Sequence, residues 1–307
     1  MKSLKGSRRK RLFNPIKDQS SAFTLVELLV VVAVLALLAS IVFSNLTGAR
    51  DQAKISNILS FQSQVQSILG ADLVVWWSFD HGENPSCGSN KVCDSSGYNN
   101  HGNNNGTTFA NNPIGSLERC VDFDGETTHS LTLNYNDSLD FESFTISFWG
   151  LYRDFTYPKT FGAVKRSNPN CYQSGGKGWD FGHGLRDNGI DFCLADGANL
   201  LRTSLRFNAE NRLENLIGRW VHLVFTVDRD RKVVSSFVDG IEQNHHLDIS
   251  SIAGSVVSQT TLSLGTMYGW ITDGQVDDFR IYSRALATSE IQSLFAQGGG
   301  GYLTRGD

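Results

Sequence analysis

The chain has 307 residues, enough for one large domain or two ordinary ones, and its 11% aromatic and 19% charged residues are typical of a folded protein rather than a disordered one. The net charge of −4 is unevenly spread, because residues 1–22 carry +6 and the rest of the chain carries −10. Nucleic-acid binding needs a net basic face, so the acidic body argues against nucleic acid as a partner.

The first predicted element is a membrane-spanning helix in residues 20–43, SSAFTLVELLVVVAVLALLASIVF. About 20 apolar residues cross the hydrocarbon core of a bilayer as a helix. The basic block precedes this segment, so the positive-inside rule places residues 1–22 in the cytoplasm and the remainder outside the cytoplasmic membrane. Glu27 lies near the cytoplasmic end of the span, where its carboxylate either reaches the interface or needs a charged partner.

The same stretch resembles the N-terminal segment of type IV pilins and pseudopilins, in which a basic leader and a small residue precede Phe-Thr-Leu-Val-Glu-Leu-Leu. The resemblance implies that a prepilin peptidase cleaves between Ala22 and Phe23 and methylates the new amino group. It also implies that Glu27 pairs with the Phe23 ammonium of a neighbouring pilin-like subunit during assembly. The sequence departs from the family at Ala22, where a glycine is usual.

A secretory signal peptide is the alternative for this region, with Thr47-Gly48-Ala49 as its cleavage site and Arg50 as the first mature residue. Against it, the apolar run is longer than the usual 7–15 residues. A glutamate at its start is also unusual for a signal peptide.

Residues after Ala49 continue a helical pattern, with apolar side chains three and four positions apart and no Gly or Pro in residues 50–69. We expect residues 23–70 to form one transmembrane and stalk helix, roughly 70 Å long at 1.5 Å per residue. Gly48 is its expected weak point, and Gly70 is its expected stop.

Residues 71–297 change from a helical period to a period of two. In FTISFWG, Phe144, Ile146 and Phe148 alternate with Thr145, Ser147 and Trp149, and WVHLVFTVD at residues 220–228 behaves similarly. Many short strands separated by Gly, Asn and Asp predict a β-sandwich. Residues 298–307 are expected to be a flexible Gly-rich tail, and we attribute its terminal Arg-Gly-Asp to chance.

Several segments in order resemble the laminin-G-like jelly roll of the concanavalin A-like lectin/glucanase fold: VVWWSFDHG, CDSSGYNNHG, CVDFDGETTHSLTL, NDSLDFESFTISFWG, RWVHLVFTVD, SSFVDGIE, LSLGTM and GQVDDFRIYSRALATSEIQSLF. The resemblance covers nearly all of residues 73–295 and implies a mainly β, antiparallel sandwich that binds glycans or proteins. It departs from the family at Ala287, where a serine commonly caps the closing helix, so we expect Thr288 or Ser289 to be the cap instead.

Enzymes share this fold, and glycoside hydrolases among them need two carboxylates about 5–5.5 Å apart for retention and farther apart for inversion. The laminarinase-like branch carries them as Glu-x-Asp-x-x-Glu on one strand, and this sequence has no such pattern. Asp140-Phe141-Glu142 lacks the second Glu, and the adjacent Asp277 and Asp278 are expected on opposite faces of a strand. We therefore predict no enzymatic activity, with a membrane-anchored glycoside hydrolase as the alternative.

A structural calcium ion is implied by the laminin-G-like resemblance, tying the first strand region to the last. The matching positions are Asp80, Asp94, Asp124 and Asp278. Calcium prefers such hard oxygen ligands. The alternative is that Asp80 and Asp94 bond to nearby turns and that Asp278 faces solvent.

Three Gly-rich or amide-rich segments are expected to lie in loops and to contact a ligand. An exposed aromatic ring stacks on a sugar while amides hold its hydroxyls, although such Trp residues also plug the ends of sandwiches. The candidates are Tyr98, Asn99, Asn100 and His101 in SGYNNHGNNNG, Trp179 in GKGWDFGHG, and Trp270 in MYGWITDG.

Five cysteines fit a domain outside the cytoplasm, where disulfides form. Cys87–Cys93 and Cys171–Cys193 are the expected pairs, which leaves Cys120 as a buried free thiol. Spacing alone does not determine this connectivity.

Together these features predict a minor pilin or pseudopilin that presents a laminin-G-like domain at a pilus or cell surface for adhesion or for glycan or protein binding. Its expected partners are pilin-like subunits, a prepilin peptidase and a surface ligand. The alternatives are a surface lectin that never assembles, the anchored hydrolase, and a pseudopilin that binds secreted protein cargo.

Overall fold

The computed structural model describes residues 25–37, 69–82, 85–111, 119–125, 128–155, 162–168, 175–186, 189–211, 213–265 and 271–300. The chain divides into two units, Met1–Asn57 and Ile58–Asp307. In the first unit, residues 25–37 are helical. In the second, Leu69 is helical and is followed by a turn at Gly70, where the end of the helix was expected. The predicted helix between these points, including Gly48, lies outside the described residues.

Apolar side chains on the helix at residues 25–37 are exposed. Leu25 is 79% exposed and Val31, the least exposed of the large ones, is still 51% exposed. So much apolar surface on one short helix is typical of a segment that contacts lipid or other protein chains. Among the described residues, none of the helices has both the length and the hydropathy needed to cross a membrane.

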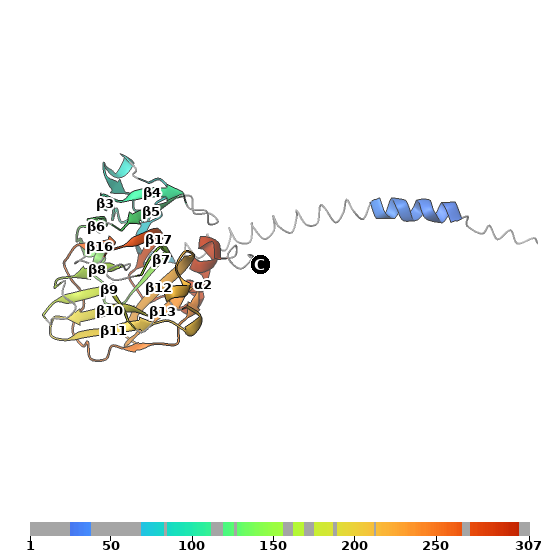
Figure 1. Ribbon diagram of the computed structural model, residues 1–307. Helices are drawn as coiled ribbons and strands as arrows, with labels where there is room; N and C mark the ends of the chain where they lie inside the picture. The colour runs from blue at the N-terminus through green and yellow to red at the C-terminus, as the bar shows by residue number, and fades with distance from the viewer. Residues whose placement is uncertain are drawn as a thin grey trace, which may run out of the picture. The chain divides into compact units, whose positions relative to one another are not determined.

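Two antiparallel sheets make up the second unit, within the part of the chain that the structure describes (Figure 1). The nine-stranded sheet, sheet A, contains β1 (Leu73–Trp77), β4 (Thr108–Asn111), β5 (Arg119–Asp124), β7 (Phe144–Tyr152), β12 (Trp220–Asp228), β13 (Val233–Val238), β14 (Ile241–Glu242), β15 (Leu247–Asp248) and β17 (Asp273–Tyr282). The eight-stranded sheet, sheet B, contains β2 (Lys91–Val92), β3 (Gly102–Asn105), β6 (Ser130–Leu133), β8 (Ala163–Arg166), β9 (Lys177–Arg186), β10 (Gly189–Asp196), β11 (Leu200–Arg206) and β16 (Leu262–Gly265).

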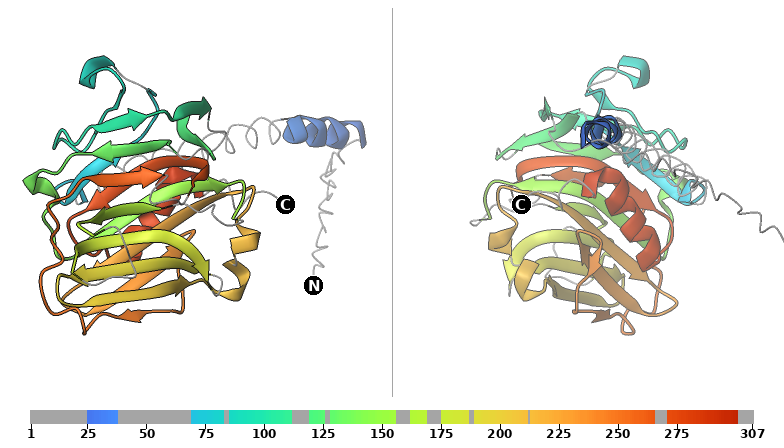
Figure 2. Two further views of the ribbon diagram at one scale, coloured as in Figure 1. Left: turned by 60° about the vertical axis from the view of Figure 1, so that its left-hand side comes forward. Right: turned by 90° about the vertical axis from the view of Figure 1, so that its right-hand side faces the viewer.

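Strand order shows how distant segments meet. Sheet A runs β14-β13-β12-β7-β17-β5-β4, with β1 paired to β17 and β15 to β13, and sheet B runs β11-β10-β9-β8-β16-β6-β3-β2. The two sheets stack face to face, as the left view of Figure 2 shows. The short helices are η1 (Pro85–Cys87), η2 (Asp137–Leu139), η3 (Ala209–Asn211) and η4 (Leu213–Asn215), and the chain closes with α2 (Thr288–Phe295) and the π-helical turn η5 (Ala296–Gly300). The predicted antiparallel sandwich is confirmed.

Strand β7 shows how the core forms and why its sequence does not simply alternate apolar with polar. Phe144, Ile146 and Phe148 face the space between the sheets, as predicted. Thr145, Ser147 and Trp149 point away from that core but are also buried, at 2% exposure or less. The cause is α2, which lies over the outer face of sheet A (Figure 2, right). Its Ile291 and Leu294 pack with Val224, Phe237 and Tyr282 of that sheet.

The start of α2 differs from the prediction. Its N-cap is Ala287, whose side chain makes no capping hydrogen bond, while Thr288 and Ser289 lie inside the helix. Instead, Glu290 reaches back and its Oε2 accepts a hydrogen bond from the Ala287 N–H at 2.7 Å. The prediction that Thr288 or Ser289 is the cap was therefore wrong, because the Glu290 contact fixes the helix start one residue earlier.

Replacing Ala287 with serine is expected to stabilise the fold by about 1 kcal/mol, because an N-cap hydroxyl accepts a hydrogen bond from the first helical turn. The backbone at Ala287 is already extended, as an N-cap requires. Thermal unfolding of the full chain in detergent measures this gain. Ala285→Ser, just outside the helix, is the matched control, and equal melting temperatures for the two variants would contradict the prediction.

Part of the expected Gly-rich tail is helical. Residues 298–300 belong to η5 rather than to an extended tail, and residues 301–307 lie outside the described residues. Gly298 approaches the Trp149 indole so closely that a Cβ would collide with its Nε1. Close packing against the indole therefore requires glycine at this position.

Candidate functional site

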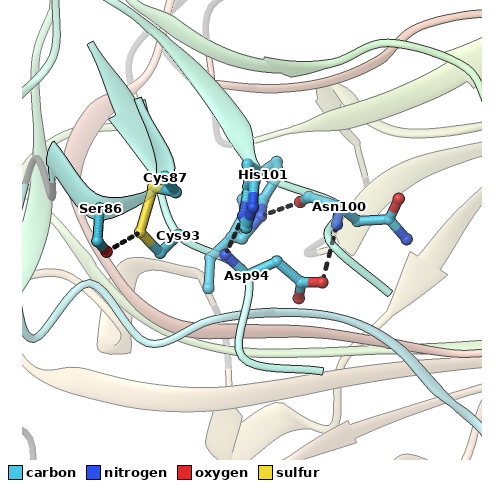
Figure 3. Close-up of a disulfide and its surroundings, with 7 residues drawn as sticks. Ser86, Cys87, Cys93, Asp94, Asn100 and His101 are labelled. Carbon is cyan, nitrogen blue, oxygen red and sulfur yellow. Dashed lines mark hydrogen bonds between the residues drawn. A yellow bond between two sulfur atoms is a disulfide. The ribbon is translucent and has the colours of Figure 1, made fainter. Parts of the chain in front are cut away.

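The segment that was expected to contact a ligand begins beside the Cys87–Cys93 disulfide, which the structure contains as predicted (Figure 3). Asp94 follows Cys93 and organises the turn after it. One oxygen of Asp94 accepts hydrogen bonds from the N–H of Trp76 at 2.8 Å and of Ser96 at 3.1 Å. The other accepts from the Ser96 hydroxyl at 2.6 Å and from the Asn100 N–H at 2.9 Å. This carboxylate holds the loop in place.

Asn100 is not available to a ligand, contrary to the prediction. Its side chain is 1% exposed, and its Nδ2 donates to the Val74 carbonyl at 2.6 Å and to the Ser138 hydroxyl at 2.8 Å. Its Oδ1 accepts from Asn136 Nδ2 at 2.6 Å. Every polar group of the amide therefore joins parts of the protein to one another.

Trp179 is also a core residue rather than a ligand contact. It is 2% exposed and its ring packs between those of Phe144 and Phe181. Trp179 therefore fills the interior of the sandwich, as such Trp residues often do. Trp270 lies outside the described residues.

The exposed part of the predicted segment is its tip. Tyr98 is 48% exposed, and Asn99 is exposed with a left-handed backbone, φ 59°. His101 is half-buried, and its Nδ1 accepts a hydrogen bond from the Asp94 N–H at 3.0 Å (Figure 3). Of the four residues predicted here, Tyr98 and Asn99 are the exposed ones, and their contact with a ligand stays a prediction.

A polar network around Trp76 joins the first strand to the last. Arg280 binds Asp278 with two contacts, Nε to Oδ1 at 2.9 Å and Nη2 to Oδ2 at 2.8 Å. The Trp76 indole N–H donates to the same Oδ1 at 2.6 Å, and the Arg280 guanidinium lies 4.7 Å from the centre of a Trp76 ring. Asp278 has φ 50°, at the bulge of β17, which brings its carboxylate to this group.

The predicted calcium ligands can be tested against these contacts. Both oxygens of Asp94 already accept hydrogen bonds from protein donors, and Asp278 is paired with a guanidinium. These two carboxylates do not fit a shared calcium site. Exposed Asp124 pairs with His129 at 2.6 Å, and half-buried Asp80 lies in the turn after β1.

Over the described ranges, no three His, Cys, Asp or Glu side chains are grouped so that they could hold a metal ion. For Asp80 and Asp124, calcium binding stays a prediction.

The remaining cysteines differ in their chemistry. Cys193 is disulfide-bonded, and its predicted partner Cys171 lies outside the described residues. Cys120 is a buried free thiol, as predicted, and burial with the nearby Asp277 charge raises its pKa to about 12. Such a thiol stays protonated and is inert at neutral pH.

His222 is the most strongly perturbed histidine in the described part of the chain. It is 2% exposed on the outer face of sheet A, beside the rings of Trp149 and Phe295, and its Nε2 lies 2.9 Å from the Ser147 hydroxyl. Burial, with a smaller effect from the Arg280 charge, lowers its pKa to about 3. The folded protein therefore holds this imidazole neutral.

The free energy of unfolding is consequently expected to decrease as the pH is lowered, because of His222. The unfolded chain takes up a proton near pH 6.5 and the folded chain only near pH 3, so lowering the pH across this window favours unfolding. The loss by pH 4.5 is about 2–3 kcal/mol. Denaturant unfolding of the wild type and His222→Gln between pH 7.5 and 4.5 measures it. Equal pH slopes for the two proteins would contradict the assignment.

Sequence patterns missed a hollow at the end of β12 and β13, which we call the β12–β13 pocket. It has a volume of about 440 Å³, within the range of ligand sites. Its lining consists of Glu142, Arg229, Asp230, Lys232, Ser250, Ile252, Ala253, Gly254 and Ser255. The charge-rich turn DRDRK at residues 228–232 was the one sequence signal of this pocket. No local pattern linked that turn to Glu142 or to residues 250–255.

At the N-terminal helix, Glu27 lies on the exposed surface described above. Ala22 and Phe23, the residues of the predicted cleavage site, lie outside the described residues. Glu27 is therefore the one residue of that predicted site that can be placed, and it stands among exposed Leu and Val side chains.

Two family models match the chain. Residues 17–43 match the prokaryotic N-terminal methylation motif, and residues 124–292, more than half of the chain, match the concanavalin A-like lectin/glucanases superfamily. Both agree with the two resemblances found in the sequence. Comparison with curated proteins found no matching sequence.

Solved structures of similar fold include binding domains of toxins. The binding domain of Paraclostridial Mosquitocidal Protein 1 is 20% identical, with a TM-score of 0.56 over 74% of this chain and 52% of that one. The receptor binding domain of botulinum neurotoxin C/D mosaic serotype is 14% identical, with a TM-score of 0.55 over 74% and 51%.

The ligand binding domain of botulinum neurotoxin serotype D, solved with N-acetylneuraminic acid, is also 14% identical, with a TM-score of 0.55 over 76% and 52%. The present chain thus spans about half the length of the structures it matches. At these identities the similarity shows the fold alone.

Proposed function

The chain belongs to the concanavalin A-like lectin/glucanases superfamily and also carries a prokaryotic N-terminal methylation motif, and from these two facts we propose that it is a minor pilin or pseudopilin that presents a binding domain at the cell surface. Its ligand is a glycan or a surface protein. The N-terminal segment anchors the chain in the cytoplasmic membrane, and the sandwich lies outside it.

The observation that carries this proposal is the exposed apolar helix at residues 25–37, with Glu27 near its start. An exposed apolar surface of this kind needs lipid or other chains around it, and a carboxylate within it needs a positively charged partner. A neighbouring subunit with a free amino group at Phe23 would cover the apolar surface and would also provide the positive charge. Cleavage by a prepilin peptidase between Ala22 and Phe23 is part of the same proposal.

Binding rather than catalysis is the role proposed for the sandwich. The solved structures of similar fold include a receptor binding domain and a ligand binding domain in complex with a sugar. That information concerns those proteins, and it favours binding here by fold analogy only. The size of the sandwich favours a minor subunit, because a domain of this size on every subunit is hard to pack along a thin fibre.

Immunogold electron microscopy of sheared surface filaments, with an antibody against the sandwich, tests the proposal. Label at filament tips or at sparse positions is the expected result. Regularly spaced label along every filament would contradict a minor role. Unlabelled filaments, with the protein retained in the membrane fraction, would contradict assembly.

A further inference from the structure

The β12–β13 pocket is built from three separate parts of the chain. Glu142 precedes β7, Arg229 and Lys232 belong to the turn between β12 and β13, and the 250–255 segment follows β15. Long-range packing of the sandwich therefore creates this surface. Loops supported by a rigid sheet are the common location of binding sites.

Hydrogen bonds with buried or half-buried side chains fix the 250–255 segment of the lining. Arg229 donates to the carbonyl of Ile252 and, at 2.7 Å, to that of Gly254. Asp196, 7% exposed at the end of β10, accepts from the Gly254 N–H at 2.8 Å. The loop that forms one wall is thus fixed from both sides, which lowers the entropic cost of binding a ligand.

Glu142 supports the end of the same segment. Glu142 accepts a hydrogen bond from the Val256 N–H at 3.0 Å through Oε2, while its side chain remains 45% exposed. Its carboxylate also lies 3.9 Å from the Arg229 guanidinium. Glu142 can therefore support the loop and still present an acceptor to the pocket.

The lining balances charge and mixes donors with acceptors. Arg229 and Lys232 are cationic, Glu142 and Asp230 are anionic, and Ser250 and Ser255 add hydroxyls. Ile252 is 2% exposed, so no large apolar side chain faces the pocket. An anion such as phosphate meets two carboxylates there. A polyhydroxyl compound fits, because each of its hydroxyls both donates and accepts.

We propose that the β12–β13 pocket binds one or two residues of an uncharged saccharide. Lys232 and the serine hydroxyls donate to sugar oxygens, and Glu142 and Asp230 accept from sugar hydroxyls. The inference rests on the proposed function, because it names a ligand class for the binding domain. Without an aromatic ring in the lining, single-site binding is weak, with Kd on the order of 1 mM. Several copies on one surface raise the avidity.

The test uses the full chain in detergent against immobilised glycans, with uncharged, sialylated and sulfated oligosaccharides on one array. The best uncharged oligosaccharide is then titrated by NMR or calorimetry. Lys232→Ala removes a donor from the lining, and Ala253→Trp fills the pocket from an exposed position. Arg231→Ala is the matched control, since Arg231 lies in the same turn, is exposed and does not line the pocket.

The expected result is binding of an uncharged oligosaccharide that weakens at least tenfold in Lys232→Ala and Ala253→Trp and stays within twofold in Arg231→Ala. Thermal unfolding checks that the variants are folded. If Ala253→Trp does not fold, the affinity of Lys232→Ala alone decides the test. Binding restricted to sialylated or sulfated glycans, no binding, or equal binding by all variants would overturn the proposal. Since the titration uses unassembled chains, failure of pilin processing would leave its result unaffected.

Discussion

Arg280→Ala is expected to lower the free energy of unfolding by about 3–5 kcal/mol, the range for breaking a buried ion pair by removing one partner. The Asp278 side chain is 9% exposed and loses its two contacts to the guanidinium. Its charge is then left with the Trp76 indole N–H as the principal described donor. Denaturant unfolding followed by tryptophan fluorescence measures the change.

A second variant separates the ion pair from simple loss of packing. Asp278→Asn combined with Arg280→Met removes both charges and keeps the bulk of each side chain. Asparagine tolerates the left-handed backbone at this position, φ 50° in the structure, and its Oδ1 still accepts from Trp76. The double variant is expected to be more stable than Arg280→Ala. A loss below 1 kcal/mol in Arg280→Ala, similar to that of exposed Arg231→Ala, would contradict the assigned role.

Glu27→Ala is expected to reduce incorporation of the protein into surface filaments at least tenfold while leaving its amount in the membrane unchanged. The reason is the proposed pairing of the carboxylate with the Phe23 ammonium of a neighbouring subunit, since opposite charges attract strongly in a medium of low dielectric constant. Alanine keeps the helix apolar and removes the charge. Quantitative immunoblots of the sheared filament fraction and of the membrane fraction measure the two quantities.

Glu27→Asp serves as the conservative control, because it keeps the carboxylate on a shorter side chain. We expect it to retain part of the incorporation that alanine abolishes. Wild-type incorporation of Glu27→Ala would show that the helix is only an anchor and would favour the surface lectin that never assembles.

Local sequence patterns were sufficient for strands such as β7 and for the disulfide between neighbouring cysteines. The alternation in FTISFWG identified Phe144, Ile146 and Phe148 as core residues, and burial in the sandwich confirms it. Cys87 and Cys93 are six residues apart, so a loop between them closes at little entropic cost. The ordered set of motifs, rather than any one of them, indicated the sandwich.

Contacts between distant segments could not be predicted in this way. Asn100 lies in a run of amides that looks solvent-exposed, but Val74, Ser138 and Asn136 enclose it only in the folded sheet. Trp179 stands in a Gly-rich stretch typical of a loop, although β9 carries it into the core. The β12–β13 pocket combines three segments that have no pattern in common.

The most direct measurement is the N-terminus of the mature protein, by intact mass and peptide sequencing of the chain purified from membranes that contain a prepilin peptidase. A chain that begins at N-methylated Phe23 is the predicted result, and it would place the sandwich on a pilin-like anchor. A chain that begins at Arg50 would show a cleaved signal peptide, and one that begins at Met1 would show an unprocessed anchor. Either of these would contradict the pilin-like function proposed here.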